Sequence, residues 1–353
     1  MANTHNTDHL WISRCFDLAR RGIGAVSPNP PVGAVLVYDN RILGEGYHIR
    51  FGGPHAEVEA FRSVADADRH LIPKATLYVS LEPCCITGKT PPCTDLILRE
   101  GVMDVRISTT DPNPLIANKG VELLRSKGIN VITGILEKEG MELIRSFQTN
   151  ILHHRPYVIL KWAQSKNGYI GKPDEKIWLS HPYTNIWTHK KRSMVDAIMV
   201  GARTVLNDDP QLTTREYEGR SPHRVIYDPN GVLSTKFRVF NDDGCRVFYF
   251  SKEENFKVSG NHIIKFSLTD DSLHPEQILK ALFLERIGIL LIEGGAYLHN
   301  LFIEQHAWDE AWVIRTENEL NAGIKAPVVK GRLKDQYDIG FDQILTILND
   351  MNL

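Results

Sequence analysis

The chain has 353 residues, of which 42% are hydrophobic and 24% charged, and this length and composition are typical of about two globular domains with ordinary cores. Its formal net charge of −2 lacks the basic excess of polynucleotide-binding proteins and favours a small-molecule substrate. We expect a cytoplasmic protein with no nucleic-acid or membrane partner. No apolar run reaches the roughly 20 residues of a membrane span, and the first residues lack a signal-peptide pattern. The five cysteines fit a reducing compartment better than a disulfide framework.

The first half of the chain predicts alternating strands and helices. Trp11, Cys15, Leu18 and Ala19 recur at the spacing of one apolar helix face. The elements expected after this helix are strands over 32–38 and 41–47, a helix over 55–64, a strand over 76–81, a helix after Cys93, a strand over 103–108, a helix over 119–127, a strand over 129–133 and a helix over 137–149. This order predicts a layered α/β/α architecture.

A polar segment that contains a proline, residues 153–156, predicts a domain boundary, because a new strand pattern follows over 157–162. We therefore expect one domain over residues 1–150 and a second over 151–353. In the second domain no Gly-x-Gly-x-x-Gly follows a strand, so a Rossmann cofactor site is not supported. A buried strand pattern over 290–293 is followed instead by Gly294-Gly295. Backbone N–H groups could approach a phosphate there, but taken alone the two glycines are more typical of a tight strand-to-helix turn.

The first domain carries the ligand set of a zinc deaminase. His55, Cys84 and Cys93 supply one imidazole and two thiolates, and three protein ligands leave the fourth position of a tetrahedral zinc open for water. Glu57 follows the histidine by two residues, where a carboxylate can take a proton from that water and return it to the substrate. Cys85 is the alternative to Cys84 as the second ligand, and we favour Cys84.

The stretch Thr76-Leu-Tyr-Val-Ser-Leu-Glu-Pro-Cys84 with Gly88-Lys-Thr-Pro-Pro-Cys93, together with Pro28-Asn-Pro-Pro-Val-Gly33 and Asp111-Pro-Asn-Pro114, resembles the bifunctional deaminase/reductases of riboflavin biosynthesis. The resemblance is strongest over residues 8–150. It implies an N-terminal domain of cytidine-deaminase-like fold that holds Zn²⁺, and a C-terminal domain of dihydrofolate-reductase-like fold that uses NADPH. It also implies two reactions: deamination of a pyrimidine ribosylamino phosphate, and reduction of its ribosyl group to ribityl. We further expect a homo-oligomer.

The resemblance also implies roles for individual residues in this chain. The expected deaminase substrate contacts are Asn29, His48 and Lys89. The expected contacts with NADPH are Ser165, Trp178, Thr204, Asp208 and Gly295. The expected reductase substrate contacts are Arg192, Leu212, Arg215 and Glu293. Two arginines suit a sugar phosphate, because a guanidinium can donate two parallel hydrogen bonds to it.

Several positions depart from the family's usual pattern. Ile86 stands where the resembled family has a histidine, which removes one polar contact from the deaminase. In the second domain the departures are Asn167, Lys176 and Pro229. They leave open a deaminase with a degenerate reductase domain, and the zinc motif alone is shared with polynucleotide base deaminases. A binding protein with a structural zinc is the remaining alternative, which Glu57 and the count of three ligands disfavour.

Overall fold

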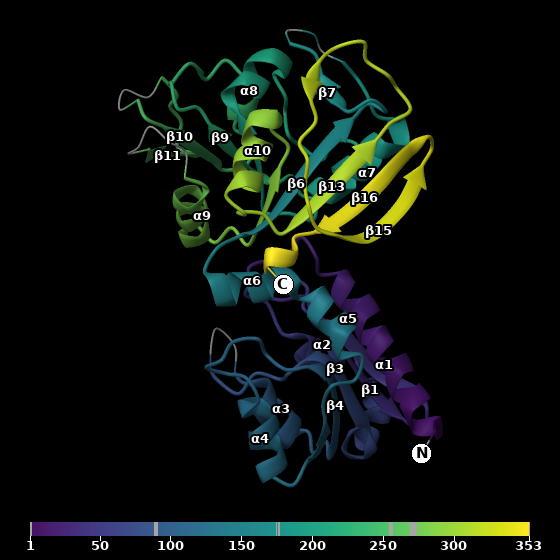
Figure 1. Ribbon diagram of the computed structural model, residues 1–353. Helices are drawn as coiled ribbons and strands as arrows, with labels where there is room; N and C mark the ends of the chain where they lie inside the picture. The colour runs from purple at the N-terminus through teal and green to yellow at the C-terminus, as the bar shows by residue number, and fades with distance from the viewer. Residues whose placement is uncertain are drawn as a thin grey trace. The chain divides into compact units, whose positions relative to one another are not determined.

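The computed structural model describes residues 2–87, 91–173, 175, 177–253, 257–268 and 274–352. The chain divides into two compact units, Met1–His154 and Arg155–Leu353, and each unit is built on its own main sheet (Figure 1). Each unit also has its own hydrophobic cores. The division falls within the polar segment 153–156. Within the described part of the chain, none of the helices has both the length and the apolar character that a membrane span requires.

The first unit is built on a five-stranded sheet with the order β2-β1-β3-β4-β5. β1 pairs antiparallel with β2 and β3, whereas β3, β4 and β5 run parallel. The strands are β1 (Gly33–Tyr38), β2 (Arg41–Tyr47), β3 (Thr76–Leu81), β4 (Asp104–Thr109) and β5 (Asn130–Ile132). The helices are α1 (Ala2–Arg20), α2 (Ala56–Arg62), α3 (Cys93–Arg99), α4 (Lys119–Ser126), α5 (Glu137–Leu143) and α6 (Arg145–His153), with a 3₁₀ segment over Asp66–Lys74.

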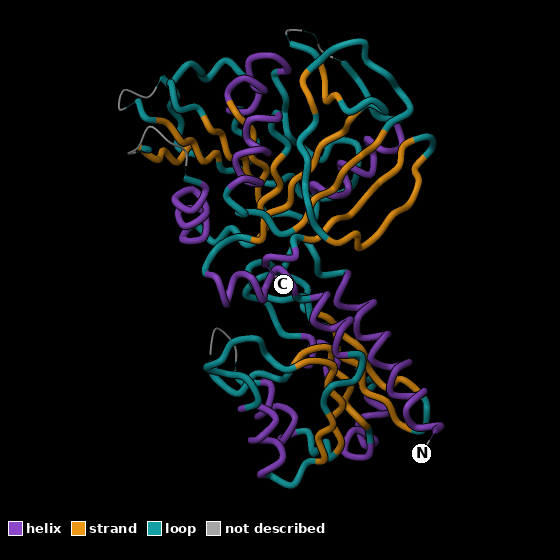
Figure 2. The backbone as a smooth tube through the Cα atoms, viewed as in Figure 1, coloured by secondary structure: helices purple, strands orange, loops and turns teal. Residues whose placement is uncertain are grey.

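Alternate side chains of each strand point to opposite faces of this sheet. Leu36 and Val79 join a core that includes residues of α2, α3 and α4. Val35 and Tyr78 join a second core with residues of α1. Helices therefore cover both faces, which confirms the expected layered α/β/α fold of this unit (Figure 2).

Two elements of the first unit differ from the sequence-based expectation. The single helix expected over 137–149 is two helices that meet at Ile144, whose backbone (φ −102°, ψ 13°) leaves the helical region while its side chain is buried. The 3₁₀ segment Asp66–Lys74 was not expected at all, because it has little apolar periodicity and contains Pro73.

The second unit is built on a nine-stranded sheet with the order β11-β10-β9-β8-β12-β6-β13-β16-β15. The strands from β11 to β13 are parallel, and β16 and β15 are added antiparallel. The strands of this sheet are β6 (Tyr157–Gln164), β8 (Ala197–Gly201), β9 (His223–Tyr227), β10 (Val247–Ser251), β11 (Ile263–Ser267), β12 (Ile289–Ile292), β13 (Glu310–Arg315), β15 (Arg332–Ile339) and β16 (Asp342–Leu348). A separate pair is formed by β7 (Tyr169–Gly171) and β14 (Ile324–Lys325).

Both faces of the larger sheet are also buried. Leu160 and Trp162 of β6 belong to a core shared with α9 (Pro275–Leu284) and α10 (Ala296–Glu304). Ile159 belongs to a core on the opposite face, to which α7 (Pro182–Arg192) and α8 (Ala202–Asp208) contribute Trp187 and Val205. Parallel strands buried on both faces present their carboxyl ends at one edge, where ligands bind in α/β proteins.

Candidate active sites

The first unit brings together a histidine and two cysteines from three separate segments. His55 Nδ1 lies 3.5 Å from Cys84 Sγ and 3.4 Å from Cys93 Sγ, and the three donor atoms all lie within 4.8 Å of one another. Donors bound tetrahedrally to zinc at about 2.1 Å for nitrogen and about 2.3 Å for sulfur are about 3.6 Å apart. The three side chains therefore fit a zinc ion with one coordination position left for water.

Local structure explains how these ligands converge. His55 is the N-cap residue of α2, Cys93 is the first residue of α3, and Cys84 lies in the segment that follows β3. Cys93 donates its backbone N–H to Cys84 Sγ at 3.4 Å. Hydrogen bonding with Cys93 and with His55 lowers the pKa of Cys84 to about 4, which favours the thiolate that zinc binds. Cys85 does not belong to this cluster.

Glu57 lies on α2 beside the cluster, and its side chain is only 3% exposed. Burial, with a further contribution from the charge of Cys84, raises its pKa to about 7. A carboxyl group with a pKa near the working pH can both accept and release a proton. The structure thus gives Glu57 the environment of a proton carrier.

Two of the three expected deaminase substrate contacts lie near the cluster. Asn29 Nδ2 is 3.1 Å from His48 Nε2, and the rings of His48 and His55 are 5.6 Å apart. His48 Nδ1 is 2.8 Å from the carbonyl of Pro54, which orients the ring. Lys89, the third expected contact, lies outside the described residues. Ile86 is 53% exposed.

Sequence reasoning missed a role for Glu82, which holds the segment that follows β4 in place. Its buried carboxylate accepts hydrogen bonds from the backbone N–H groups of Asp111, Asn118, Gly120 and Val121 at 2.9 to 3.3 Å. These bonds tie the segment after β4 to the segment that carries Cys84. The available signal was an acidic residue directly after an apolar strand, where burial without partners would be costly.

In the second unit, an arginine and a glutamate expected to contact substrate are paired with each other. Arg192 donates from Nε to Glu293 Oε1 at 2.9 Å and from Nη2 to Glu293 Oε2 at 2.7 Å. Arg192 ends α7 and Glu293 follows β12, so the pair joins a helix to the carboxyl edge of the sheet. This bidentate geometry leaves further N–H groups of the guanidinium for a ligand.

A cavity of about 340 Å³ opens beside this ion pair. All four expected reductase substrate residues line it, together with three of the expected cofactor residues: Arg192, Leu212, Arg215, Glu293, Trp178, Thr204 and Asp208. Trp178 is 60% exposed, which leaves its ring available to a ligand.

A larger cavity of about 790 Å³ shares Thr204 and Asp208 with the first. Gly295 lines it at the start of α10, and a Cβ placed on this glycine would lie 3.8 Å from the Thr204 hydroxyl. Pro229 lines this cavity as well. These two adjoining cavities have the sizes expected of ligand pockets.

Ser165 is placed differently from the other expected cofactor contacts. It is fully buried, its hydroxyl donates to Asn167 Oδ1 at 2.8 Å, and the same oxygen accepts from the Tyr169 N–H at 2.9 Å. Asn167 in turn donates to the carbonyl of Leu320 at 2.7 Å. The structure thus gives Ser165 and Asn167 hydrogen bonds that stabilise the turn between β6 and β7. Lys176 lies outside the described residues.

Lys161 is a lining residue that sequence reasoning missed. It lies on β6, its Nζ is 3.9 Å from Glu293 Oε2, and it lines a cavity with Arg192, Trp178 and Gly295. Burial lowers its pKa. The available signal was one lysine inside an otherwise apolar strand, since Lys is almost never fully buried without a partner.

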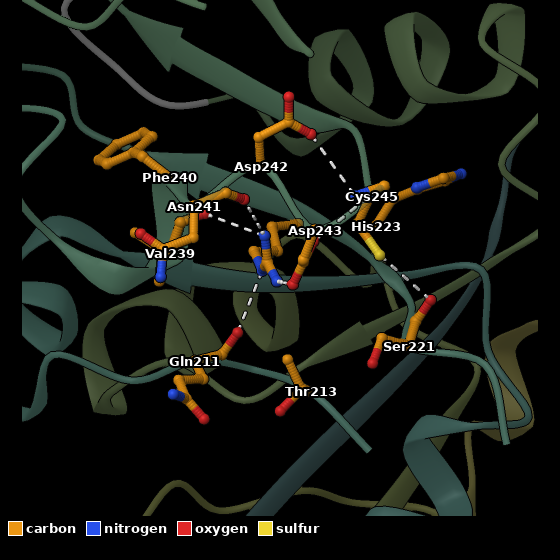
Figure 3. A network of polar contacts seen from close by, with 12 residues as sticks. Gln211, Thr213, Ser221, His223, Val239, Phe240, Asn241, Asp242, Asp243 and Cys245 are labelled. Carbon is orange, nitrogen blue, oxygen red and sulfur yellow. Dashed lines mark hydrogen bonds and ion pairs between the residues drawn. The ribbon is translucent and has the colours of Figure 1, made fainter. Parts of the chain in front are cut away.

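The segment that carries Leu212 is held by a buried arginine. Arg224, on β9, donates to the carbonyls of Gln211 and Asn241 at 3.0 and 3.1 Å and forms an ion pair with Asp243 (Figure 3). Leu212 itself has a φ of 57°, a left-handed conformation that costs a branched residue roughly 1–2 kcal/mol. The Arg224 network therefore fixes one wall of the smaller cavity.

Comparison with known proteins identifies the family. Residues 5–109 match the cytidine and deoxycytidylate deaminase zinc-binding region, and residues 156–315 match the RibD C-terminal domain. The riboflavin biosynthesis protein RibD of Aquifex aeolicus is 36% identical over 90% of this chain and 89% of that protein. RibD of Bacillus amyloliquefaciens is 33% identical over 98% of this chain and 95% of its own length. This chain belongs to the RibD family.

Solved structures agree with this assignment. A deaminase/reductase from Thermotoga maritima superimposes with a TM-score of 0.90 and 38% identity, covering 98% of this chain and 99% of the other. Acinetobacter baumannii RibD superimposes with a TM-score of 0.86 and 29% identity over the same shares. The chain is therefore a bifunctional RibD enzyme, a zinc-dependent deaminase joined to an NADPH-dependent reductase, and it acts on small molecules. The RibD C-terminal match also disfavours a polynucleotide deaminase.

Proposed function

We propose that the chain deaminates 2,5-diamino-6-ribosylamino-4(3H)-pyrimidinone 5′-phosphate and then reduces the ribosyl group of the product to ribityl with NADPH. Residues 1–150 would carry the first reaction and residues 151–353 the second. The observation that carries the proposal is the His55, Cys84 and Cys93 cluster with buried Glu57 beside it. The Thermotoga maritima protein, whose name describes both activities, supports the choice of substrate.

In the deaminase, His55, Cys84 and Cys93 would hold zinc. When bound, zinc lowers the pKa of a water molecule to about 7 and so supplies the nucleophile. Glu57 accepts a proton from the attacking water and delivers it to the ring nitrogen, and the leaving amino group is then protonated by the same route. Its raised pKa of about 7 suits both directions of transfer.

Asn29, His48 and Lys89 would bind the pyrimidine and its ribose phosphate. Asn29 and His48 are in contact at 3.1 Å, and the His48 ring lies 5.6 Å from the ring of the zinc ligand His55. Pro54 fixes the ring of His48 through its carbonyl, so these groups are oriented before substrate arrives, which limits the ordering cost of binding.

In the reductase, Ser165, Trp178, Thr204, Asp208 and Gly295 would bind NADPH, which supplies the hydride when bound. Arg192, Leu212, Arg215 and Glu293 would bind the ribosylamino phosphate. Arg192 and Glu293 orient each other through two hydrogen bonds. This orientation favours a carboxylate that accepts from ribose hydroxyls and a guanidinium that donates to the phosphate.

We also propose a cytoplasmic homo-oligomer. All five cysteines are free in the structure, as expected in a reducing compartment. β15 lies at one edge of the nine-stranded sheet, and Phe341 in the following turn is 78% exposed. An edge strand, which pairs with its sheet along one side only, beside an exposed apolar side chain is a surface on which a second copy can pair. Sedimentation of the purified protein tests this, and a purely monomeric species would contradict it.

The proposed reactions are tested by two rates measured on one preparation. Ammonia release from the diaminopyrimidine nucleotide should proceed without NADPH, and NADPH oxidation should require the deaminated product. Ammonia release without any NADPH oxidation would instead support a deaminase with a degenerate reductase domain.

A further inference from the structure

Among the residues that the structure describes, a buried histidine beside the smaller reductase cavity has no hydrogen-bond partner. His189 of α7 has no exposed surface, and neither ring nitrogen makes a hydrogen bond within the part of the chain that the structure describes. A buried polar group without a partner is costly, and in native proteins it commonly serves a ligand or a water molecule. Glu216 is a charged neighbour of this ring, and its Oε1 lies 3.8 Å from His189 Nε2.

Three side chains that can donate a hydrogen bond to an anion lie around the Glu216 carboxylate. Its Oε2 accepts a hydrogen bond from Asn185 Nδ2, and its Oε1 faces both His189 Nε2 at 3.8 Å and Arg215 Nη2 at 3.7 Å. The Glu216 side chain is 39% exposed, so it lies at the protein surface and is free to move away without opening a core.

These three neighbours of Glu216 also line the 340 Å³ cavity beside the proposed substrate residue Arg192. The charged groups of the lining are Arg192, Arg215 and Arg238 against the two carboxylates of Asp208 and Glu293. With neutral histidine, the lining therefore carries one net positive charge, which is less than the charge of a phosphate dianion. A protonated imidazole would supply the second positive charge.

We infer that the Glu216 carboxylate holds the place of the substrate's phosphate in the unliganded reductase, and that Asn185 and His189 become phosphate ligands when the phosphate displaces it. The inference rests on the proposed function, because it requires a phosphorylated substrate. Carboxylate and phosphate oxygens accept from the same amide, imidazole and guanidinium donors. Phosphate carries more charge and more acceptor oxygens than the carboxylate, so it can engage Arg215, Asn185 and His189 together.

The environment of His189 agrees with this exchange. Burial and the positive charges of Arg192 and Arg215 lower its pKa, while Glu216 and Glu293 raise it. A bound phosphate would add negative charge next to the imidazole and favour its protonated form, which donates from both ring nitrogens. The exchange of carboxylate for phosphate thus provides the hydrogen-bond partner that His189 lacks.

The test compares Glu216→Gln with Glu218→Gln in the full-length protein. Both variants remove one exposed negative charge from the same loop, but only Glu216 faces the three donors. Glu216→Gln should bind inorganic phosphate about two- to fivefold more tightly, the range for losing one exposed competing ion pair, with a matching fall in the KM of the reductase substrate and unchanged kcat. Glu218→Gln should behave like the wild type. Equal or weaker phosphate binding by Glu216→Gln would overturn the inference.

A second pair of variants tests His189 directly. His189→Phe keeps an aromatic ring but loses both donors, and phosphate binding should weaken about tenfold, as for loss of a charge-assisted hydrogen bond. His189→Gln keeps a donor and should retain most of the affinity. An unchanged thermal midpoint followed by tryptophan fluorescence, to which five of the six tryptophans contribute from the second unit, shows that this unit is folded in each variant. If His189→Phe bound phosphate as tightly as the wild type, the inference would be overturned, but the proposed reductase activity would not be contradicted. A different outcome would reject the proposed function and keep the phosphate site: the wild type fails to oxidise NADPH, while Glu216→Gln binds phosphate more tightly and His189→Phe more weakly than the wild type.

Discussion

Arg192 and Glu293 form a buried bidentate ion pair between residues 101 positions apart, with hydrogen bonds of 2.9 and 2.7 Å. The pair joins the end of α7 to the carboxyl end of β12 and lines the cavity between them. Removing one partner of a buried pair leaves the other charge without compensation, which typically costs about 3–5 kcal/mol. The pair therefore matters both for the stability of the second unit and for the shape of the cavity that it lines.

The first prediction concerns acid stability. Burial alone would raise the pKa of Glu293, but the charges of Arg192 and Lys161 hold it at about 2. Because the folded pKa lies below the unfolded value of about 4.3, Glu293 stabilises the fold above that value by about 3 kcal/mol, and this contribution is lost as the pH falls towards 2. Tryptophan fluorescence reports this unit, since Trp11 is the one tryptophan in residues 1–154. The thermal midpoint of Glu293→Gln should be lower at pH 7 and should change less between pH 4.5 and 2.5 than that of the wild type.

The second prediction is that the two activities separate. Arg192→Ala should raise the KM of the reductase substrate by roughly 10- to 150-fold, as for loss of a charged hydrogen-bond partner. Ammonia release should persist, because no deaminase residue proposed above lies in the second unit. Steady-state NADPH oxidation and ammonia release measured on the same sample check this. Unchanged reduction in Arg192→Ala would place the reductase site elsewhere.

The third prediction concerns metal content. Purified protein should contain about one zinc per chain, because three donors converge at one point. Cys84→Ala should lose the metal, whereas Cys85→Ala is the matched control and should keep it, since Cys85 is not part of the cluster. Elemental analysis of both variants decides the matter, and zinc retained by Cys84→Ala at the wild-type level would contradict the ligand assignment. Chelation should stop ammonia release while NADPH oxidation of an already deaminated substrate continues.

The fourth prediction tests the proton carrier. Glu57→Gln should keep zinc and fold but lose deamination by roughly 10²- to 10⁴-fold, the usual contribution of a general acid–base group. Reduction of an already deaminated substrate should be unaffected. Ammonia release near the wild-type rate in the zinc-loaded variant would rule out Glu57 as the proton carrier.

The sequence predicts the first unit well where side-chain periodicity follows burial. The alternation of Val35 and Leu36 between two cores is a local property of a strand, so β1 to β4 could be placed from the sequence alone. The break at Ile144 could not, because it depends on how that side chain packs against the rest of the unit. The zinc cluster was visible as residue types and spacing, although the distances between its atoms come only from the fold.

The second unit was harder to predict at the level of individual contacts. The pairing of Arg192 with Glu293 requires that α7 and β12 meet, which no local pattern encodes. The same is true of Arg224, which holds the carbonyl of Gln211 from the neighbouring strand β9. Ser165 was visible as a motif position, but the two hydrogen bonds of its hydroxyl within the turn could be found only from the fold.

The most direct test of the account identifies products by mass after incubation of the full-length protein with the diaminopyrimidine ribosylamino phosphate. Without NADPH, the only nucleotide product should be the one in which one amino group has been replaced by oxygen and released as ammonia. With NADPH, that product should gain two hydrogens as the ribosyl group becomes ribityl. A substrate of unchanged mass in zinc-loaded protein, or a product that never gains hydrogen in the presence of NADPH, would contradict the claim that this chain catalyses both reactions.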